Sequence, residues 1–551
     1  MCHTLTVNGE IEHTLRGSWT PSGAASAPLS PAALRWLRHR IGLTETTTPA
    51  VPSSLLDVPG SSLADTPRAE LEALLGERHV LVDAAARLGR AGGMSYSDLV
   101  RRRDGAELAV PDAVLLPSDP ELVQGVLEIC ARHDIAVVPF GGGTSVVGGV
   151  DALRGGKNAV VALDLVRLDR LISLDPDSRI AVLQAGMRAT EAESLLAAHG
   201  FTLGHFPQSF ERATIGGFAA TRSAGQASSG YGRFEDMVEG VRLATPAGEW
   251  KLGVAPASAA GPDLRQLAIG SEGILGVITE VAVRVRPAPR RSRYEAFVVD
   301  GWQAGTDAVR ALAQERVLAD VTRLSDPAET EVQLALSGQL KARALGNLLR
   351  AKGVRNPCLL VLGWDAGTRT ELKQRRAAAV RALRDVRTVR LGRAAGESWK
   401  SHRFSGPRQR DALLDRGVCV ETLETATSWS GLSELRSAVR TALVRNLQTG
   451  SKPPIVMCHV SHAYETGASL YFTVLAPRDS EHALAQWQRA KEAACDAIAG
   501  RGTISHHHAV GVDHRPWLGA EIGDIGTAVL TAAKRAVDPT GILNPGKLLR
   551  D

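Results

Sequence analysis

Cysteine and aromatic residues are scarce in this 551-residue sequence, and each shortage excludes a class of protein. The six cysteines lie far apart and form no Cys-x-x-Cys pair, so we expect free thiols in a reducing, cytoplasmic setting rather than a disulfide framework. Aromatic residues make up 4% of the chain, and no interleaving with basic residues suggests stacking on bases. We therefore expect no nucleic-acid partner.

Long apolar runs are also lacking. No stretch approaches the roughly 20 apolar residues that a helix needs to cross a bilayer. The first residues, MCHTLTVNGEIEH, lack the basic segment followed by an apolar segment that is typical of a secretory leader. No internal repeat is evident. We therefore expect a soluble cytoplasmic protein that contacts membranes at most peripherally, with a homodimer as its candidate assembly.

The composition is typical of a large globular protein. Hydrophobic residues make up 44% and charged residues 22% of the sequence. A chain of 551 residues is longer than chains that fold around a single hydrophobic core, so we expect two or more domains. The net charge of +5 weakly favours anionic ligands.

Four segments follow from the secondary-structure signals. Residues 1–109 form an N-terminal extension, loosely built and helical around Ala33–Ile41. Residues 110–290 alternate short apolar strands with glycine-rich turns and one helix that Ser118 or Asp119 caps. The strands of this segment are expected at Ala113–Leu116, Ile135–Val138, Val160–Leu165, Ile180–Gln184 and Ile278–Val285.

The turn-rich stretch RPAPRR at 286–291 marks the boundary to a segment with a different sequence pattern. Residues 291–505 alternate strands with long Ala/Leu/Arg helices, which favours an antiparallel sheet covered by helices. Residues 506–551 form a compact C-terminal segment. The helices of the third segment are expected at 303–318, 330–352, 369–384, 431–448 and 482–499, and its strands at Cys358–Trp364, Val418–Thr422, Ile455–Val460 and Ser469–Leu475.

The stretch PFGGGTSVVGGV at 139–150 is typical of a loop that binds an anion. Consecutive glycines let the backbone approach a ligand and present N–H groups to it. The stretch is not a P-loop, because no Lys precedes the Ser/Thr, and not a Rossmann fingerprint, because no helix follows. A simple glycine turn without a ligand remains an alternative for this loop alone.

Two further stretches rich in small polar residues lie at 205–232 and 269–287. Three such loops within about 150 residues, each beside a strand, exceed what turns require. They suit a large ligand with a diphosphate and many hydrogen-bonding atoms.

Three consecutive histidines, His506, His507 and His508, stand in TISHHHAVG. In an extended segment His506 and His508 would share one face and His507 would point away, so the three cannot easily bind one metal ion. A buried structural strand is a second alternative, although each imidazole would need a partner. Proton transfer near neutral pH is the third, and we favour it, with no metal site.

Six motifs in order carry a resemblance to a known family. They are PFGGGTS, PQSFERATIGGF, TRSAG, GSEGILGVI, SHAYETGASLYF and SHHHAVG. On these residues the sequence resembles the vanillyl-alcohol oxidase family of flavoproteins, and within it the alkyldihydroxyacetonephosphate synthase branch, over about residues 90–551. The resemblance implies an α+β protein with the two-subdomain FAD-binding fold of this family and an α+β cap.

The resemblance also implies FAD, held without a covalent bond, and the segments that contact it. Gln208 departs from the family, which usually has Asp there. The implied cofactor residues are Pro139, Phe140, Gly141, Gly142, Gly143, Thr144, Ser145, Gln208, Ser209, Phe210, Glu211, Arg212, Ala213, Thr214, Thr221, Arg222, Ser223, Ala224, Glu272, Gly273, Ile274, Leu275, Gly276, Val277 and Ile278.

For the reaction, the resemblance implies that Tyr471, Arg323 and the histidines 506–508 are catalytic and that Arg410 binds substrate. His459 and His462 lie near Tyr471 in the predicted sheet. The expected activity exchanges the acyl chain of acyl-dihydroxyacetone phosphate for a long-chain alcohol, a step of ether-lipid synthesis with no net redox change. An FAD-dependent dehydrogenase or oxidase of a 2-hydroxy acid such as lactate or glycolate is the alternative, and a non-catalytic flavin-binding module is disfavoured.

Overall fold

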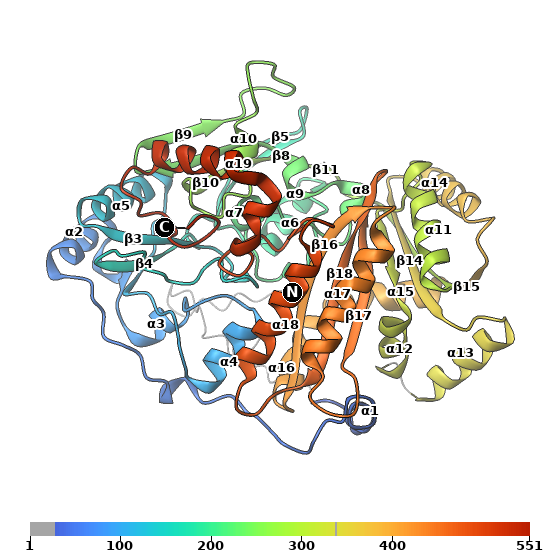
Figure 1. Ribbon diagram of the computed structural model, residues 1–551. Helices are drawn as coiled ribbons and strands as arrows, with labels where there is room; N and C mark the ends of the chain where they lie inside the picture. Colours follow the sequence, from blue (N-terminus) through green and yellow to red (C-terminus); the bar gives the residue numbers. More distant parts are fainter. Residues whose placement is uncertain (1–27, 337–338, 551) are drawn as a thin grey trace.

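The structure is a computed structural model that describes residues 28–336 and 339–550 (Figure 1). Its architecture is α+β, as predicted. We call the part up to Pro287 the cradle region, because it carries the glycine-rich loops, and the part from Arg291 to Ile498 the cap region. The first 27 residues of the expected N-terminal extension lie outside the described residues.

A small, mostly parallel sheet holds the first glycine loop. Its elements and the two helices beside it are β1 (Val80–Leu81), β2 (Ala113–Leu115), β3 (Ile135–Phe140), β4 (Ala159–Asp164), α2 (Asp65–Leu75) and α5 (Pro120–Arg132). The strand order is β1-β2-β4-β3, with β1 antiparallel to β2 and the other pairs parallel. The strands β2, β3 and β4 are almost wholly apolar, as suits parallel strands covered on both faces. Asp119 caps α5, as predicted, by accepting a bond from the Leu122 N–H group.

A second, antiparallel sheet carries the third glycine loop. It consists of β5 (Leu171–Asp175), β6 (Ile180–Gln184), β8 (Val238–Thr245), β9 (Gly248–Leu252) and β10 (Val277–Arg284), in the order β5-β6-β10-β8-β9. The strands predicted around residues 180 and 280 are confirmed within one residue. The smaller elements of the region are α3 (Ala84–Leu88), α6 (Ala189–Ala198), α7 (Ile215–Ala220), α8 (Ser228–Tyr231), α9 (Phe234–Met237), α10 (Arg265–Ala268) and the ribbon of β7 (Phe201–Thr202) and β11 (Arg286–Pro287).

The cap region is built on an antiparallel sheet, as predicted, and this sheet has seven strands. Its strands are β12 (Arg291–Asp300), β13 (Val321–Ser325), β14 (Pro357–Ala366), β15 (Thr388–Gly392), β16 (Val418–Ser428), β17 (Ile455–Ala463) and β18 (Gly467–Pro477). Their order is β15-β12-β14-β13-β17-β18-β16. Side chains alternate along β18, so that Leu470, Phe472 and Val474 enter the core while the residues between them face the opposite side.

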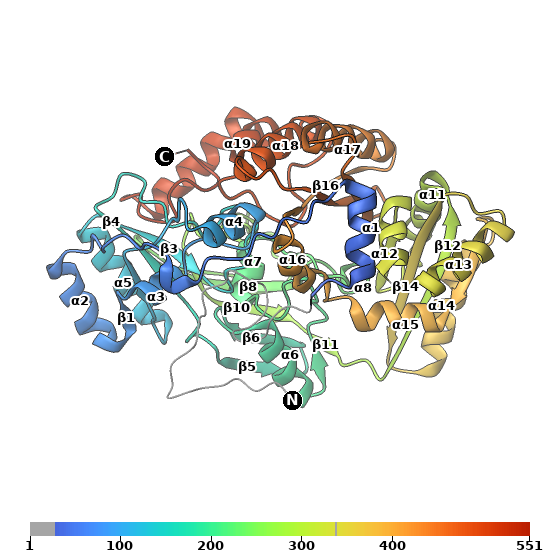
Figure 2. The same ribbon diagram turned by 90° about the horizontal axis from the view of Figure 1, so that it is seen from below.

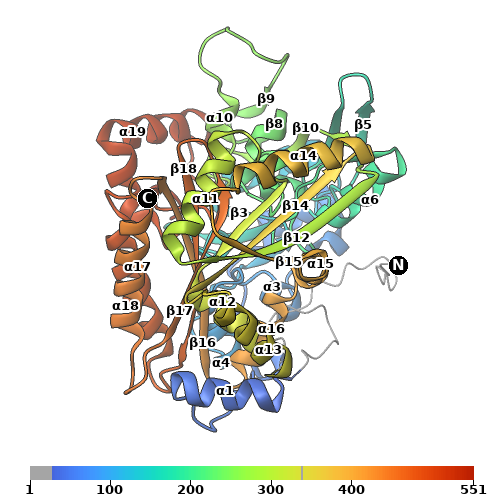
Figure 3. The same cartoon turned by 90° about the vertical axis from the view of Figure 1, so that its right-hand side faces the viewer.

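Eight helices of the described residues cover this sheet. They are α11 (Trp302–Gln314), α12 (Pro327–Leu336), α13 (Gln339–Ala351), α14 (Arg369–Ala382), α15 (Arg393–His402), α16 (Gly406–Leu414), α17 (Leu432–Leu447) and α18 (Ala483–Ile498). Figure 3 shows α17 and α18 along one side of β16–β18, where their apolar residues complete the core. The prediction of a single helix over 330–352 is wrong, because two helices, α12 and α13, occupy this range.

The N-terminal segment is packed more closely than expected. Helix α1 (Pro31–Ile41) lies beside α12 and β18, as Figure 2 shows for α12. Helix α4 (Tyr96–Asp104) packs against α18 and β16, and its residues Tyr96 and Leu99 are fully buried in the core of the cap region. These contacts differ from the loose packing predicted for the extension, because the sequence pattern does not show which distant elements its apolar residues meet.

The chain ends back in the cradle region. After helix α19 (Arg515–Val537), Ile542 and Asn544 form backbone bonds with Val137 of β3 (Figure 1). Among residues 28–336 and 339–550, none of the helices combines the length and the apolar character that crossing a membrane requires.

Candidate active site

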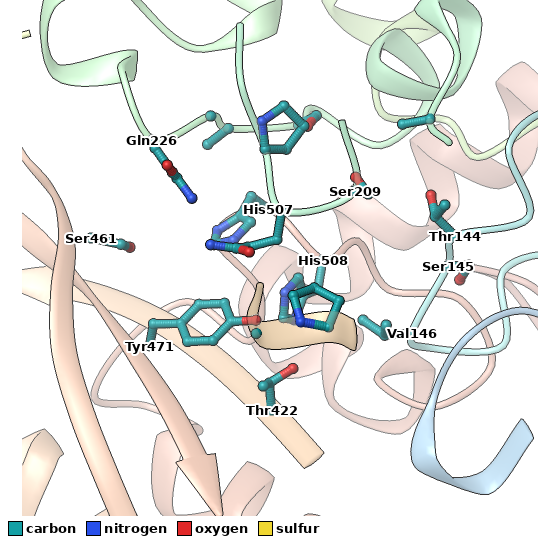
Figure 4. A pocket seen from close by; sticks show the side chains of 18 of the residues that line it. Thr144, Ser145, Val146, Ser209, Gln226, Thr422, Ser461, Tyr471, His507 and His508 are labelled. Atoms are coloured by element: carbon teal, nitrogen blue, oxygen red, sulfur yellow. The ribbon is translucent and has the colours of Figure 1, made fainter. Parts of the chain in front are cut away.

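A cavity of about 1020 Å³ lies between the cradle region and the cap region. The three glycine-rich loops line one side of it, and strands β13 and β16–β18 line the other. In Figure 4, Thr144 and Ser145 of the first loop lie across the pocket from Tyr471 and Ser461 of the sheet. The cavity therefore brings together segments that are more than 300 residues apart.

The glycines of the first loop are required by close packing. A Cβ atom at Gly142 would lie 2.4 Å from the Arg212 carbonyl oxygen, and one at Gly141 would lie 2.4 Å from Thr214 Oγ1. Gly143 has a φ of +61°, which favours glycine. The loop is thus pressed against the second glycine-rich stretch, with its backbone open to the cavity.

Most of the residues that the resemblance assigned to the cofactor line this cavity. They are Pro139, Phe140, Gly141, Gly142, Gly143, Thr144, Ser145, Gln208, Ser209, Ala213, Thr214, Thr221, Ser223, Ala224, Glu272, Gly273, Gly276 and Ile278. The others, Phe210, Glu211, Arg212, Arg222, Ile274, Leu275 and Val277, do not line it. Consecutive side chains point in different directions, so an unbroken run cannot face one ligand; Ile274 and Leu275, for example, pack in an apolar cluster with Leu548.

Several buried polar atoms around the cavity have no partner among the described residues. The side-chain oxygens of Gln208 and Gln226, both lining the cavity, accept no hydrogen bond, and neither does His205 Nδ1 nearby. Buried polar groups are normally paired, so these atoms are placed for a bound polar molecule. A cavity with a glycine loop at one wall and free amide oxygens beside it fits FAD.

Strands β17, β18 and β16 place three functional side chains in one row. Tyr471 of β18 pairs with His459 of β17 on one side and with Glu424 of β16 on the other. The rings of His459 and Tyr471 stack with centroids 4.9 Å apart. The hydroxyl end of Tyr471 points toward His508 in Figure 4. Burial raises the pKa of Tyr471 to about 12, so its phenol remains protonated near neutral pH.

Glu424 holds the histidine triplet in place. Its carboxylate accepts hydrogen bonds from the backbone N–H groups of His506, His507 and His508, at 2.7, 3.1 and 2.9 Å, and from the Ser505 hydroxyl at 2.8 Å. Burial alone would raise the pKa of Glu424, but the backbone N–H groups of His507 and His508 stabilise the charged carboxylate and lower the pKa. The carboxylate is therefore charged, with only 1% of its residue exposed.

This anchor bends the triplet, and the alternation expected for an extended segment does not occur. His507 and His508 both line the cavity, whereas His506 lies behind its wall. Three successive N–H groups converge on one carboxylate, which an extended strand cannot achieve. On the cradle side, Glu272 accepts bonds from the N–H groups of Val510 and Gly511, at 2.8 and 2.7 Å. One carboxylate from each region thus fixes residues 505–511.

The imidazoles of the cluster are neutral. Burial lowers the pKa of His506 and His507 well below its ordinary value and also lowers the pKa of His508. Burial likewise lowers the pKa of His462 to about 4. A neutral imidazole can accept a proton, so the cluster is suited to act as a base.

A metal ion is the other ligand to consider here. Ring nitrogens of His462, His506 and His507 lie within 4.8 Å of one another, so the fold brings together a group that the triplet alone could not form. The ring nitrogens of His462 and His506 already have partners, however. His462 contacts the Gly225 carbonyl and the Ser461 hydroxyl, and both nitrogens of His506 are hydrogen-bonded. We keep the expectation that the cluster acts without a metal.

Two of the arginines that line the cavity, Arg323 and Arg410, are each held by a buried carboxylate. Arg323 of β13 contacts Glu329 at 2.6 Å and His459 at 2.9 Å. Although burial would raise it, the pKa of Glu329 is held well below its ordinary value by Arg323 and His459. Arg410 of α16 bonds Glu421 at 2.6 Å and the Met94 carbonyl at 2.8 Å. The Nε atoms of both arginines have no partner among the described residues.

The cavity becomes apolar away from the histidines. On the face of the sheet that carries Tyr471, the next residues along β18 are Thr473 and Leu475, which also line the cavity. A strand rises about 3.3 Å per residue, so Leu475 lies roughly 13 Å from Tyr471. The apolar residues that line this end of the cavity include Leu29, Ala33, Trp36, Leu37, Val332, Leu413, Val420, Met457 and Leu475.

Some of these residues were not found by reasoning from the sequence. Glu424, Glu421 and Glu329 stand in ordinary strand and helix patterns and became visible only through strand register and packing. The contribution of α1 to the apolar lining was likewise not predicted from the sequence pattern. His459 and His462 were suggested by their motif, and the structure places both at the cavity.

Known proteins match the chain along most of its length. Two family models match, the FAD binding domain over residues 111–252 and the C-terminal domain of FAD linked oxidases over residues 288–548. The alkyldihydroxyacetonephosphate synthase of Dictyostelium discoideum is 30% identical over 490 residues, which cover 87% of this chain and 80% of that protein. A solved structure of alkyldihydroxyacetonephosphate synthase has a TM-score of 0.81 and 27% identity, covering 94% of this chain and 92% of that one.

The structure of p-cresol methylhydroxylase, at 17% identity, shares the fold, with a TM-score of 0.63 and coverage of 88% of this chain and 96% of that one. The cavity and the matched domains define an FAD-dependent flavoprotein, and its fold is the one that p-cresol methylhydroxylase has. The identity and coverage shared with the Dictyostelium discoideum protein narrow the assignment. The chain belongs to the alkyldihydroxyacetonephosphate synthase family.

Proposed function

We propose that this enzyme exchanges the acyl chain of acyl-dihydroxyacetone phosphate for a long-chain alcohol, with no net redox change. The single observation that carries the proposal is the gradient of the cavity. It runs from the glycine loops, past Tyr471 and the histidines, to an apolar end at Leu475 and Trp36. A polar reacting centre beside an apolar space of this kind suits a phosphorylated head group with a long alkyl chain.

FAD, when bound, would supply a temporary acceptor for electrons at the reacting carbon. It would lie on the first glycine loop, within reach of Gln208 and Gln226. We assign to Tyr471 the assistance of proton removal at C1 of the substrate, since it lies across the pocket from this loop. We assign to His507 and His508 the removal of the proton from the incoming alcohol, since both are neutral and line the cavity.

The substrate phosphate would be bound by an arginine. Arg410 and Arg323 both line the cavity, and a guanidinium group matches a phosphate through paired N–H donors. Each arginine already shares its charge with a buried carboxylate, which fixes its position in advance. We assign phosphate binding to Arg410, as the family motif suggests, and contact with the reacting end of the substrate to Arg323.

We also propose the surroundings in which the enzyme works. Both substrates carry long alkyl chains, so we expect peripheral contact with a membrane surface from a cytoplasmic protein. We further propose a homodimer. Analytical ultracentrifugation tests the assembly, and flotation with vesicles tests the membrane contact.

The decisive experiment separates the exchange from oxidation of a 2-hydroxy acid. Purified FAD-loaded protein is mixed without oxygen with palmitoyl-dihydroxyacetone phosphate and hexadecanol, and separately with D-lactate. We expect the ether product and free palmitate in the first mixture and no lasting bleaching of the flavin in the second. Bleaching by D-lactate together with the absence of ether would instead support the dehydrogenase alternative.

A further inference from the structure

A chain of hydrogen bonds leads from the cavity to a tyrosine outside it. His507 Nδ1 lies 2.9 Å from His506 Nδ1, and His506 Nε2 lies 2.6 Å from Tyr464 Oη. The other nitrogen of His507 has no hydrogen-bond partner among the described residues, and the residue lines the cavity. The three groups therefore connect in series, without a gap.

The members of this chain differ in their access to substrate and solvent. His506 is only 5% exposed and does not line the cavity, so it cannot contact a substrate there. Tyr464 follows directly after β17, is half-buried, and precedes Glu465, which is exposed. The chain thus runs from the cavity, through the buried His506, to a residue that is more exposed than His506.

The proposed exchange leaves one proton to be removed in each turnover. The bond between C1 and the acyl oxygen breaks, and the acyl group leaves as a carboxylate with the electron pair of that bond. The alcohol oxygen forms the new bond to C1 and loses its proton. Because a carboxylic acid is ionised near neutral pH, the fatty acid does not take this proton with it.

We propose that Tyr464 is the outer member of a proton relay, Tyr464–His506–His507, that carries this proton from the active site to solvent. The inference rests on the proposed function. His507 accepts the proton from the alcohol and passes its Nδ1 proton to His506. His506 passes its Nε2 proton to Tyr464 Oη, which releases its own proton outward. Tyr464 acts through the histidines and so is a positioning residue.

The surroundings of Tyr464 agree with this role. Burial raises the pKa of Tyr464 to about 12, with Arg233, Glu235 and Asp236 as charged neighbours. The phenol therefore stays protonated and can accept one proton while it releases another, without forming a phenolate. Arg233 also donates a bond of 2.7 Å to the His506 carbonyl oxygen, which ties this group to the triplet.

Tyr464→Phe tests the relay because it removes the hydroxyl and keeps the ring. We expect normal FAD content and an unchanged KM for acyl-dihydroxyacetone phosphate, with kcat for ether formation lowered about tenfold or more. Millimolar imidazole in the assay should restore much of the lost kcat by carrying the proton in place of the side chain. Tyr464→His, which keeps a proton-carrying group, should retain most of the parent turnover.

Tyr231→Phe is the matched control, since its hydroxyl bonds Asp365 at 3.3 Å and Tyr231 does not line the cavity. It should leave kcat unchanged, with or without imidazole. If Tyr464→Phe does not retain FAD, Tyr464→Met replaces it in the same comparison. Parent kcat in the variant, or a loss that imidazole and Tyr464→His do not restore, contradicts the relay. A parent enzyme that forms no ether contradicts the proposed function itself.

Discussion

Gly142 is the residue at which the first loop depends most on the absence of a side chain. From the sequence we expected the glycines of this loop to let the backbone approach an anionic ligand, and glycine is also favoured wherever φ is positive. The structure assigns the positive φ to Gly143 and shows that a Cβ atom at Gly142 would collide with the Arg212 carbonyl oxygen. Packing between two loops, rather than backbone conformation, therefore requires glycine at this position.

We expect Gly142→Val to abolish FAD binding, because the displaced loop can no longer line the cavity. Flavin absorbance per chain after gel filtration measures the effect. Gly450→Ala is the control, since a Cβ atom there meets no other atom within 4 Å. Normal flavin content in a folded Gly142→Val protein would mean that the cofactor is held elsewhere.

Variants of Tyr471 and His507 distinguish a catalytic role of these residues from a role in packing alone. If they move protons, Tyr471→Phe and His507→Ala should bind FAD like the parent and lose about 100-fold or more of turnover, the usual effect of removing a positioned acid or base. Melting temperature, FAD content and product formation are measured on the same samples. Unchanged turnover with a lowered melting temperature in both variants would show that the two residues serve packing alone.

At the scale of the element, strand β16 decides the geometry of the triplet. Its register places Glu424 opposite Tyr471, and the carboxylate then collects the three N–H groups. Glu424→Gln keeps the size of the side chain but removes the charge and one acceptor oxygen. A buried N–H group left without a partner costs about 1–3 kcal/mol.

We therefore expect Glu424→Gln to lower the free energy of unfolding by about that amount and to reduce turnover more than FAD binding. Denaturant unfolding and steady-state kinetics measure the two effects. Glu434→Gln, at an exposed position on α17, is the control and should change neither. A Glu424→Gln protein with parent stability and turnover would show that the triplet keeps its shape without this anchor.

The elements also show how far the sequence could be used for prediction. The strands around residues 135, 160 and 280 and the helix after Asp119 were predictable, because their apolar period and caps are local signals. The glycine loops and the histidines were visible as motifs for the same reason. Glu424 and α1 were not, because their roles depend on register and on contacts across hundreds of residues. The bend of the triplet follows from Glu424 and was missed with it.

At the scale of the whole molecule, the buried histidines make the fold sensitive to acid. Burial lowers the pKa of His205 and of His514 to about 3 and that of His462 to about 4, from an ordinary value of 6.5. At pH values between these lowered pKa values and 6.5, the unfolded chain binds more protons than the folded chain. The free energy of unfolding therefore falls as the pH falls through this range. Asp151 and Glu272, whose pKa burial raises to about 7, act in the opposite direction and offset part of this loss of stability.

We expect the free energy of unfolding to decrease from about pH 6.5 to about pH 5, by up to about 1.4 kcal/mol per pH unit for each such histidine. Denaturant titrations at several pH values measure the slope. His514→Gln should make it less steep, since His514 does not line the cavity but is buried, whereas the exposed His482→Gln should leave it unchanged. Stability that rises on acidification would contradict the neutral state of the cluster.

The central claim is that the enzyme forms an ether bond without net oxidation or reduction. Counting turnovers in the complete absence of oxygen and of any other electron acceptor tests it most directly. Protein loaded with FAD is supplied with excess acyl-dihydroxyacetone phosphate and hexadecanol, and the ether product is counted per chain. We predict many ether molecules per chain, an equal amount of fatty acid and a flavin that ends oxidised. No ether, or a reaction that stops after one turnover with the flavin reduced, would contradict the account.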